Sequence, residues 1–186
     1  DALSGHVYLD CGASHFELLS LPIEQFPKFG DDEPQVLATV PELTFRTAVN
    51  QVAFAAARDG LRQLLNSVLI SFEQQATRLV ATDGHRLAMI EIPELIQDLS
   101  GEYLVPAKSM EEAARLISGQ EEVHIAGTAK QLSFRTASTL LQTRLVEGKY
   151  LPYDSIIPTE FSVDAVVLRS ELLAALERAE LFTSDK

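Results

Sequence analysis

The sequence predicts an α+β fold in which a unit of one strand, one helix and three strands occurs twice. Apolar residues recur at helical spacing in two segments, 43–57 and 106–118. A short strand-like run precedes each segment, and three runs with the turn residues typical of antiparallel strands follow it. We therefore expect the order βαβββ, βαβββ along residues 35–146.

The first residues predict a separate hairpin. Residues 6–10 alternate in polarity, and Cys-Gly-Ala-Ser separates them from the strand-like run 15–21. Prolines, a glycine and two aspartates then indicate a linker over 22–34.

The first helix is predicted to follow the strand 35–40 and to begin at Pro41-Glu42. Proline suits a first helical turn, and a glutamate is favoured near the positive end of the helix dipole. The side chains expected on its buried face share one helical stripe and are Phe45, Val49, Val52 and Ala56.

The second helix is expected to turn a similar face inward and to stop at Gly119. Its inward residues share the same spacing and are Met110, Ala113, Ala114 and Ile117. A connection spans 93–101. The remaining strands are expected at 66–73, 78–82, 85–92, 102–105, 122–126, 131–136 and 139–146.

Composition bounds the possible functions. An apolar fraction of 46% fits a globular protein with a core, and a net charge of −12 argues against gripping nucleic acid by charge alone. It is compatible with a protein that encloses DNA. No apolar run is long enough to span a bilayer, so we expect no membrane span. The single Cys11 fits a reducing cytoplasm, and because the histidines lack metal-ligand spacing we expect no metal site.

A long internal repeat indicates duplicated domains. Residues 21–29 echo 145–153, and residues 40–52 echo 163–175, a period of about 120 residues. Because the chain opens on Asp1 rather than Met, we expect it to be a piece of a longer protein. The expected divisions are the tail of one domain at 1–34, a whole second domain at 35–158 and the start of a third at 159–186.

The most specific stretch is Ala-Thr-Asp-Gly-His-Arg-Leu-Ala at residues 81–88. Asp83-Gly84 between two strand-like runs predicts a tight two-residue hairpin turn, because glycine accepts a positive φ. The string as a whole resembles the signature hairpin of the bacterial DNA polymerase III beta subunit, the replication sliding clamp, in its middle domain.

This resemblance implies a DNA-clamp fold and a mechanical function. Such a clamp is a processivity factor: a head-to-tail homodimer ring encloses duplex DNA independently of sequence. The implied partners are the polymerase III catalytic subunit, the clamp loader and other proteins with a clamp-binding motif. No catalysis or cofactor is implied.

The resemblance also implies a hydrophobic cleft for partner peptides. The matching positions are Thr82, Gly84, His85, Arg86, Leu87, Leu151, Ser155 and Ile156. Leu87 and Ile156 would form the apolar floor of the cleft for a leucine or aromatic side chain of the partner. The aliphatic stem of Arg86 would extend the cleft wall. This chain has Leu151 where the family usually has proline, and lacks an arginine common near Ser155.

A second set of residues is expected to face DNA. The resemblance places both helices on the inner surface of the ring, where phosphate contacts carry no sequence information. The expected DNA-proximal residues are Arg46, Arg58, Arg62, Gln63, Lys108 and Arg115. Glu111 and Glu112 in the same helical turn dilute the positive field.

One alternative from another class stays open. The Asp83–His85 turn could serve a stand-alone α+β ligand-binding or hydrolytic domain, with the two side chains as an acid/base pair. No serine or cysteine elbow or glycine-rich phosphate loop accompanies them, and Asp83 has a sufficient explanation as a turn former.

Overall fold

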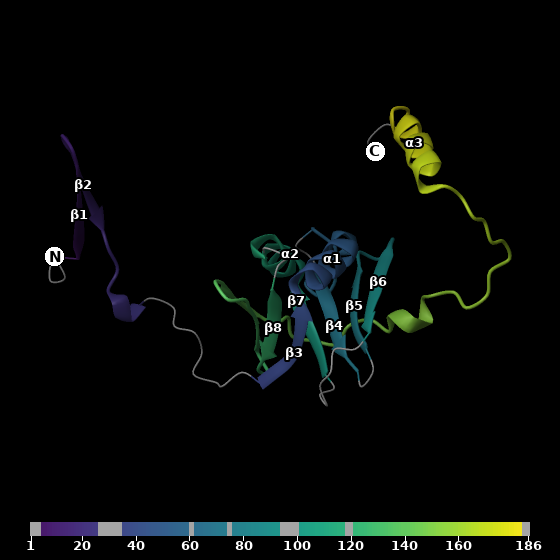
Figure 1. Ribbon diagram of the computed structural model, residues 1–186, viewed down its shortest axis with the longest axis horizontal. Helices are drawn as coiled ribbons and strands as arrows, with labels where there is room; N and C mark the ends of the chain where they lie inside the picture. The colour runs from purple at the N-terminus through teal and green to yellow at the C-terminus, as the bar shows by residue number, and fades with distance from the viewer. Residues whose placement is uncertain are drawn as a thin grey trace. The chain divides into compact units, whose positions relative to one another are not determined.

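The computed structural model describes residues 5–25, 35–59, 62–73, 76–93, 101–117 and 121–183 (Figure 1). The chain divides into two units, Asp1–Tyr150 and Leu151–Lys186. Within the described residues, no helix is long and apolar enough to cross a membrane. The predicted stop at Gly119 and most of the linker over 22–34 lie outside the described residues.

The predicted N-terminal hairpin is confirmed. Strands β1 (His6–Cys11) and β2 (Ser14–Leu19) pair antiparallel, with Cys11 opposite Ser14. Gly12, in the two-residue turn between them, has a φ of 61°, which a glycine adopts without strain. A short 3-10 turn, η1 (Ile23–Gln25), follows.

The predicted βαβββ order is also confirmed, as two antiparallel four-stranded sheets. One sheet has the order β10-β9-β8-β3 and the other β6-β5-β4-β7. The strands of the first are β3 (Gln35–Pro41), β8 (Glu122–Gly127), β9 (Gln131–Arg135) and β10 (Leu140–Arg144). Those of the second are β4 (Ser67–Phe72), β5 (Ala76–Thr82), β6 (Leu87–Pro93) and β7 (Gly101–Pro106).

The two sheets do not correspond to the two βαβββ halves of the sequence, because the halves exchange their first strands. Strand β3 opens the first half but pairs with β8 of the second, and β7 opens the second half but pairs with β4 of the first. Each half therefore completes its sheet with a strand from the other half, which joins the halves into one fold.

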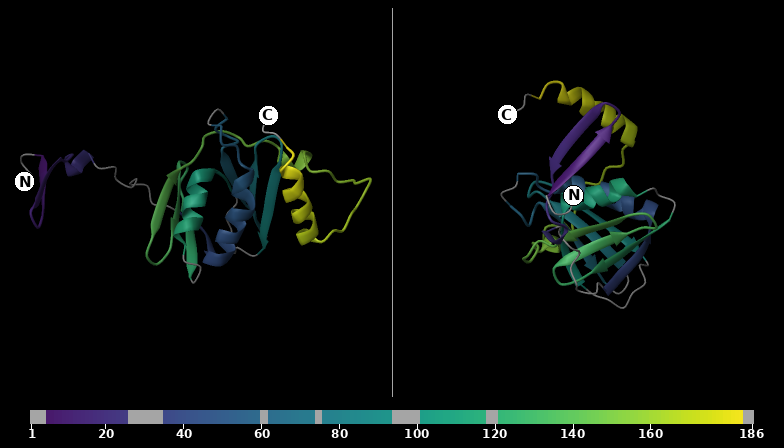
Figure 2. Two further views of the ribbon diagram at one scale, coloured as in Figure 1. Left: turned by 90° about the horizontal axis from the view of Figure 1, so that it is seen from above. Right: turned by 90° about the vertical axis from the view of Figure 1, so that its left-hand side faces the viewer.

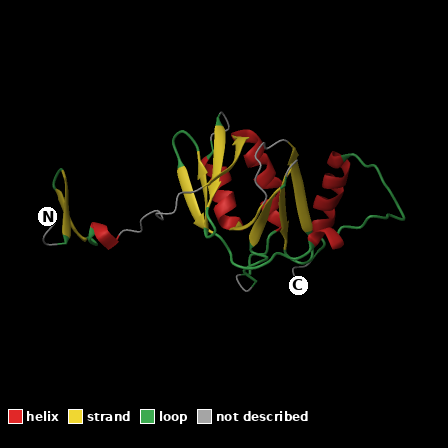
Figure 3. Cartoon of the chain, turned by 90° about the horizontal axis from the view of Figure 1, so that it is seen from below, coloured by secondary structure: helices red, strands yellow, loops and turns green. Residues whose placement is uncertain are grey.

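Two helices lie side by side on one side of the sheets, as the opposite views of Figures 2 and 3 show. They are α1 (Glu42–Val52) and α2 (Ala107–Leu116), and each begins directly after the proline that ends a strand. The first helical N–H of each donates to the opposite half, from Glu42 to the Glu121 carbonyl and from Ala107 to the Asn66 carbonyl, at 2.8 and 2.9 Å.

The first helix is shorter than predicted. Helix α1 ends at Val52, whose φ of −122° leaves the helical region, and the chain continues as the 3-10 turn η2 (Ala53–Ala55). Helix α2 ends because Ile117 is extended. The predicted inward residues of both helices are buried, and the Phe45 and Phe134 rings, with centroids 5.2 Å apart, join α1 to β9 in the core.

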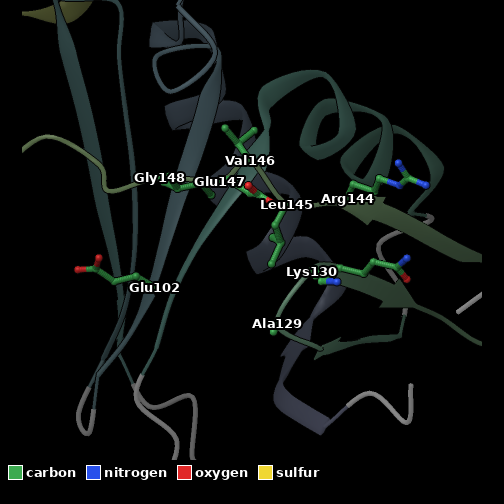
Figure 4. Close-up of a pocket in the computed structure, with 10 residues that line it drawn as sticks. Glu102, Ala129, Lys130, Arg144, Leu145, Val146, Glu147 and Gly148 are labelled. Carbon is green, nitrogen blue, oxygen red and sulfur yellow. The ribbon is translucent and has the colours of Figure 1, made fainter. Parts of the chain in front are cut away.

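Residues 145–150 cross from the outer edge of β7 to the end of β5 in the second sheet. The Val146 N–H donates to the Leu104 carbonyl of β7 at 2.8 Å, and the Thr82 N–H of β5 donates to the Tyr150 hydroxyl at 3.2 Å. Between β7 and β5 lies β4, all six of whose residues are buried. The segment also borders a hollow of about 580 Å³, in which Glu102 and Arg144 point in opposite directions (Figure 4).

The second unit holds the 3-10 turn η3 (Tyr153–Ser155) and the helix α3 (Arg169–Glu180). Helix α3 overlaps the second half of the repeated segment 163–175 and extends five residues beyond it. Its apolar side chains Leu172, Leu173 and Leu176 are exposed.

Candidate functional site

The turn between β5 and β6 is longer than its sequence predicts. Thr82 lies opposite Leu87, so the four residues 83–86 form the loop, and the predicted two-residue turn is wrong. Within the loop, the Asp83 carboxylate Oδ1 accepts the backbone N–H groups of His85 at 2.9 Å and Arg86 at 3.0 Å. These bonds stabilise the four-residue turn, and Gly84 takes a φ of 93° inside it.

Thr82 closes the same loop from its first strand. Its hydroxyl donates to the Arg86 carbonyl at 2.6 Å and accepts the Gly84 N–H at 3.0 Å. The residue is buried, so both bonds are shielded from competing water. The side chains of Thr82 and Asp83 therefore set the loop conformation by bonding backbone groups of residues 84–86.

The Asp83 carboxylate is fully engaged in hydrogen bonds within the loop. Hydrogen bonds from the backbone N–H groups of His85 and Arg86 hold the pKa of its carboxyl below the usual value. A carboxylate that is held ionised and already accepts three hydrogen bonds is poorly suited to take up a proton in catalysis. This geometry favours the turn-forming role of Asp83 over the hydrolytic alternative.

Arg86 is bonded within its own chain rather than left free in water. Its Nε donates to Asp83 Oδ2 at 3.1 Å, and its Nη2 donates to the Phe54 carbonyl at 2.9 Å. The guanidinium carbon also lies 5.3 Å from the centre of the Phe54 ring, a cation–π distance. Its aliphatic stem remains available as a wall, but its charged end holds the loop.

Two residues of this site were missed in the sequence analysis, Phe54 and Tyr150. The buried Tyr150 hydroxyl accepts the Thr82 N–H, and burial raises the pKa of the phenol. Phe54 had a detectable signal: it is a large aromatic residue in the segment 43–57 that falls off the buried helical stripe. Tyr150 had none, because nothing local links it to a strand that lies 68 residues earlier.

The remaining predicted cleft residues fall in two places. Leu87 is half-buried at the start of β6, and His85 is exposed in the loop. Leu151, Ser155 and Ile156 belong to the second unit, where Ile156 is 55% exposed and the Ser155 hydroxyl donates to the Pro152 carbonyl at 2.7 Å. The five predicted cleft residues between positions 82 and 87 thus lie together in the first unit.

The predicted DNA-proximal residues are also divided. Arg58 and Lys108 line one hollow of about 410 Å³ between η2 and the first turns of α2, together with Glu111 and Glu112. Arg58 pairs with Glu111, and Arg115, on α2, pairs with Glu112, each at 2.6 Å. Glu111 thus neutralises Arg58 in this hollow, while Glu112 is paired with Arg115.

The other predicted DNA-proximal residues, and Lys108 itself, take no part in these two ion pairs. Arg62 pairs with Asp59 at 2.9 Å, and a side chain at Gly84 would come within 3.5 Å of its Nη1, so it stands beside the loop 83–86. Gln63 follows it and is exposed. Within the described part of the chain, Arg46 and Lys108 make no ion pair.

Comparison with known proteins identifies the family. Residues 39–152, more than half of the chain, match the model of the DNA polymerase III beta subunit, central domain. The chain belongs to this family. The match covers all of α1, α2 and the loop 83–86.

Individual relatives agree with the family match. The beta sliding clamp of Streptomyces coelicolor is 36% identical over 92% of this chain, and that of Chlamydia pneumoniae 32% identical over 94%. The chain spans about half the length of these curated relatives, 47% and 48%.

Solved structures support the same fold. The crystal structure of the DNA polymerase sliding clamp from Bacillus subtilis matches with a TM-score of 0.89 and 26% identity, over all of this chain and 50% of that one. The DNA polymerase III subunit beta from Pseudomonas aeruginosa matches with a TM-score of 0.87 and 28% identity, over 98% of this chain and 51% of that one. The predicted α+β sliding-clamp fold is confirmed, and members of this family are not enzymes.

Proposed function

We propose that the protein is a processivity factor of bacterial DNA replication, a sliding clamp that tethers polymerase to its template. The observation that carries this proposal is the match of residues 39–152 to the beta subunit central domain. The pre-formed loop 83–86, with the half-buried Leu87 beside it, supports a docking role within that domain.

In this proposal the complete protein is a cytoplasmic homodimer ring around duplex DNA. It binds the polymerase III catalytic subunit, the clamp loader and other proteins with the clamp-binding motif. Residues 1–34 end a first domain, 35–158 form the middle domain and 159–186 begin a third. The family match at 39–152 lies inside the proposed middle domain.

The proposed docking site uses a few apolar side chains on a rigid frame. Leu87 and Ile156 form floor for a leucine or aromatic side chain of the partner, and Leu151 adds to it. Gly84 lets the partner backbone approach closely, while Thr82, His85 and Ser155 supply polar edge. Arg86 contributes its stem and fixes the loop, and a rigid loop lowers the entropy cost of binding.

Calorimetry on the complete gene product tests the docking site. A peptide ending in leucine and phenylalanine should bind with micromolar affinity, about −8 kcal/mol. Leu87→Ala should weaken binding by about 1–2 kcal/mol by removing an apolar contact. Equal binding to the wild type and to a folded Leu87→Ala, Ile156→Ala double variant would show that the assignment is wrong.

DNA contact is proposed for Arg46, Arg58, Arg62, Gln63, Lys108 and Arg115, and salt dependence tests it. Replacing Lys108 and Arg62 with glutamate should weaken DNA contact and shorten processive synthesis. Each lost phosphate contact should lower the slope of log K against log salt by about one unit. An unchanged slope would remove both residues from the DNA surface.

A further inference from the structure

We propose that Phe54 is a positioning residue for partner docking, which holds Arg86 and, through Arg86, the loop 83–86 in its binding conformation. This inference rests on the proposed docking function of the loop. It assigns a role to an exposed aromatic residue that lies 32 positions before Arg86 and on a different element.

The first argument is the double contact between the two residues. The Phe54 carbonyl accepts an N–H from Arg86 Nη2 at 2.9 Å, while the Phe54 ring lies 5.3 Å from the guanidinium carbon. One contact is a hydrogen bond to the guanidinium and the other places its carbon over the aromatic ring. Together they hold in place a side chain that would otherwise sample many rotamers.

The second argument is the rigidity of the element that presents Phe54. Its neighbours in η2, Ala53 and Ala55, are 2% and 0% exposed, so both are anchored in the core. Phe54 itself is 49% exposed and lies outside the core cluster. Its ring therefore contributes less to core packing than a buried aromatic, and it lies at a cation–π distance from Arg86.

The third argument is the path from Arg86 into the loop. Arg86 Nε donates to Asp83 Oδ2 at 3.1 Å, and Asp83 Oδ1 accepts the two backbone N–H groups that shape the loop. Leu87, the proposed apolar contact, follows Arg86 directly in the chain. An Arg86 side chain that lost Phe54 would hold Asp83 less firmly and leave the loop more conformations to lose on binding.

Binding of the leucine–phenylalanine peptide to variants of the complete gene product tests the proposal. Phe54→Ala and Phe54→Leu should both weaken binding about two- to fivefold, because neither offers an aromatic face. Phe54→Trp should restore wild-type affinity. Leu43→Ala, which truncates a similarly exposed apolar side chain near the start of α1, is the matched control and should leave peptide affinity unchanged.

A second measurement needs no peptide. Amide hydrogen exchange of the free protein should show faster exchange at His85 and Arg86 in Phe54→Ala, with an unchanged unfolding midpoint and unchanged exchange at Thr139 in the other hairpin. If wild-type protein failed to bind the peptide, the docking function would fall, while faster loop exchange would still support the positioning role.

Two results would overturn the proposal. One is unchanged loop exchange together with unchanged affinity in Phe54→Ala. The other is full affinity in Phe54→Leu with loss only in Phe54→Ala, which would mean that Phe54 meets the peptide through apolar contact rather than by holding Arg86.

Discussion

The loops 83–86 and 136–139 occupy the same place in the two βαβββ halves, yet they are bonded differently. Each has four residues between its last paired strand positions, Thr82 with Leu87 and Arg135 with Leu140. In the second loop the described bonds stay inside the turn: the Thr139 N–H donates to the Thr136 hydroxyl at 3.2 Å, and the Thr136 N–H to the Thr139 carbonyl at 2.9 Å.

The first loop is bonded to distant parts of the domain as well. Arg86 reaches Phe54 on η2, and Thr82 reaches Tyr150 at the end of the crossing segment. The two hairpins therefore share a topology but differ in the side chains that tie their loops to the rest of the domain. In the proposed docking function, these few side chains distinguish the first loop from the second.

The largest expected effect comes from cutting the bond between the crossing segment and β5. Tyr150→Phe leaves the Thr82 N–H buried without its acceptor, which should lower the free energy of unfolding by about 1–3 kcal/mol. Urea unfolding followed by circular dichroism measures this change.

Tyr103→Phe is the matched control for that substitution. Tyr103 is half-buried and packs edge-on against Phe72, with ring centroids 5.7 Å apart. Its loss of a hydroxyl should change the free energy of unfolding by less than about 0.5 kcal/mol. Equal losses in both variants would mean that the Tyr150 hydrogen bond contributes nothing particular.

The next effect sharpens the contrast in backbone conformation. Gly84→Ala places a side chain at a φ of 93°, which should cost about 1–2 kcal/mol of stability. The reciprocal change, Ala137→Gly at the matching position of the second loop, should cost less than about 1 kcal/mol, chiefly through the unfolded chain. A larger loss for Ala137→Gly would contradict the difference between the loops.

A smaller effect is expected from the second loop itself. Thr136→Ala removes the one side-chain acceptor for the Thr139 N–H, but this loop is partly exposed and water can replace the bond. We expect a loss of about 0.5–1 kcal/mol in the free energy of unfolding and no change in peptide affinity. Weakened peptide binding in this variant would contradict the assignment of docking to the first loop alone.

The sequence predicted the elements well because local chemistry sets them. Helical stripes, prolines at helix starts and turn residues between strands placed both helices and the eight strands of the two sheets near their observed positions. The loop 83–86 shows where such reasoning stops. Asp-Gly indicated a two-residue turn, but the loop has four residues and is stabilised by the Asp83 carboxylate, which accepts two backbone N–H groups.

Long-range contacts could not be predicted from periodicity. The exchange of β3 and β7 between the two sheets depends on tertiary pairing, and strand-like runs do not name their partners. Likewise, Arg86 gave no sign that its charge would be held by a carbonyl of η2, and Tyr150 gave none that its hydroxyl would bond β5. Residues that hold a site from a distance lack a local pattern.

The smallest expected effect is a local response of the first loop to acid. The folded-state pKa of Asp83 lies below its ordinary value of 3.8, since backbone N–H groups stabilise the ionised form. Its contribution to loop stability is therefore complete above pH 3.8 and is lost as the pH falls through the lower folded value. Protection of the His85 and Arg86 amides, relative to their intrinsic exchange rates, should decline over that range.

The second loop has no carboxylate between Arg135 and Leu140, so protection of the Thr139 amide should not follow the same curve. In Asp83→Asn the pH dependence should vanish from the first loop. An NMR titration that placed the Asp83 pKa at or above 3.8, or a parallel decline at Thr139, would show that the carboxylate does not set this loop apart.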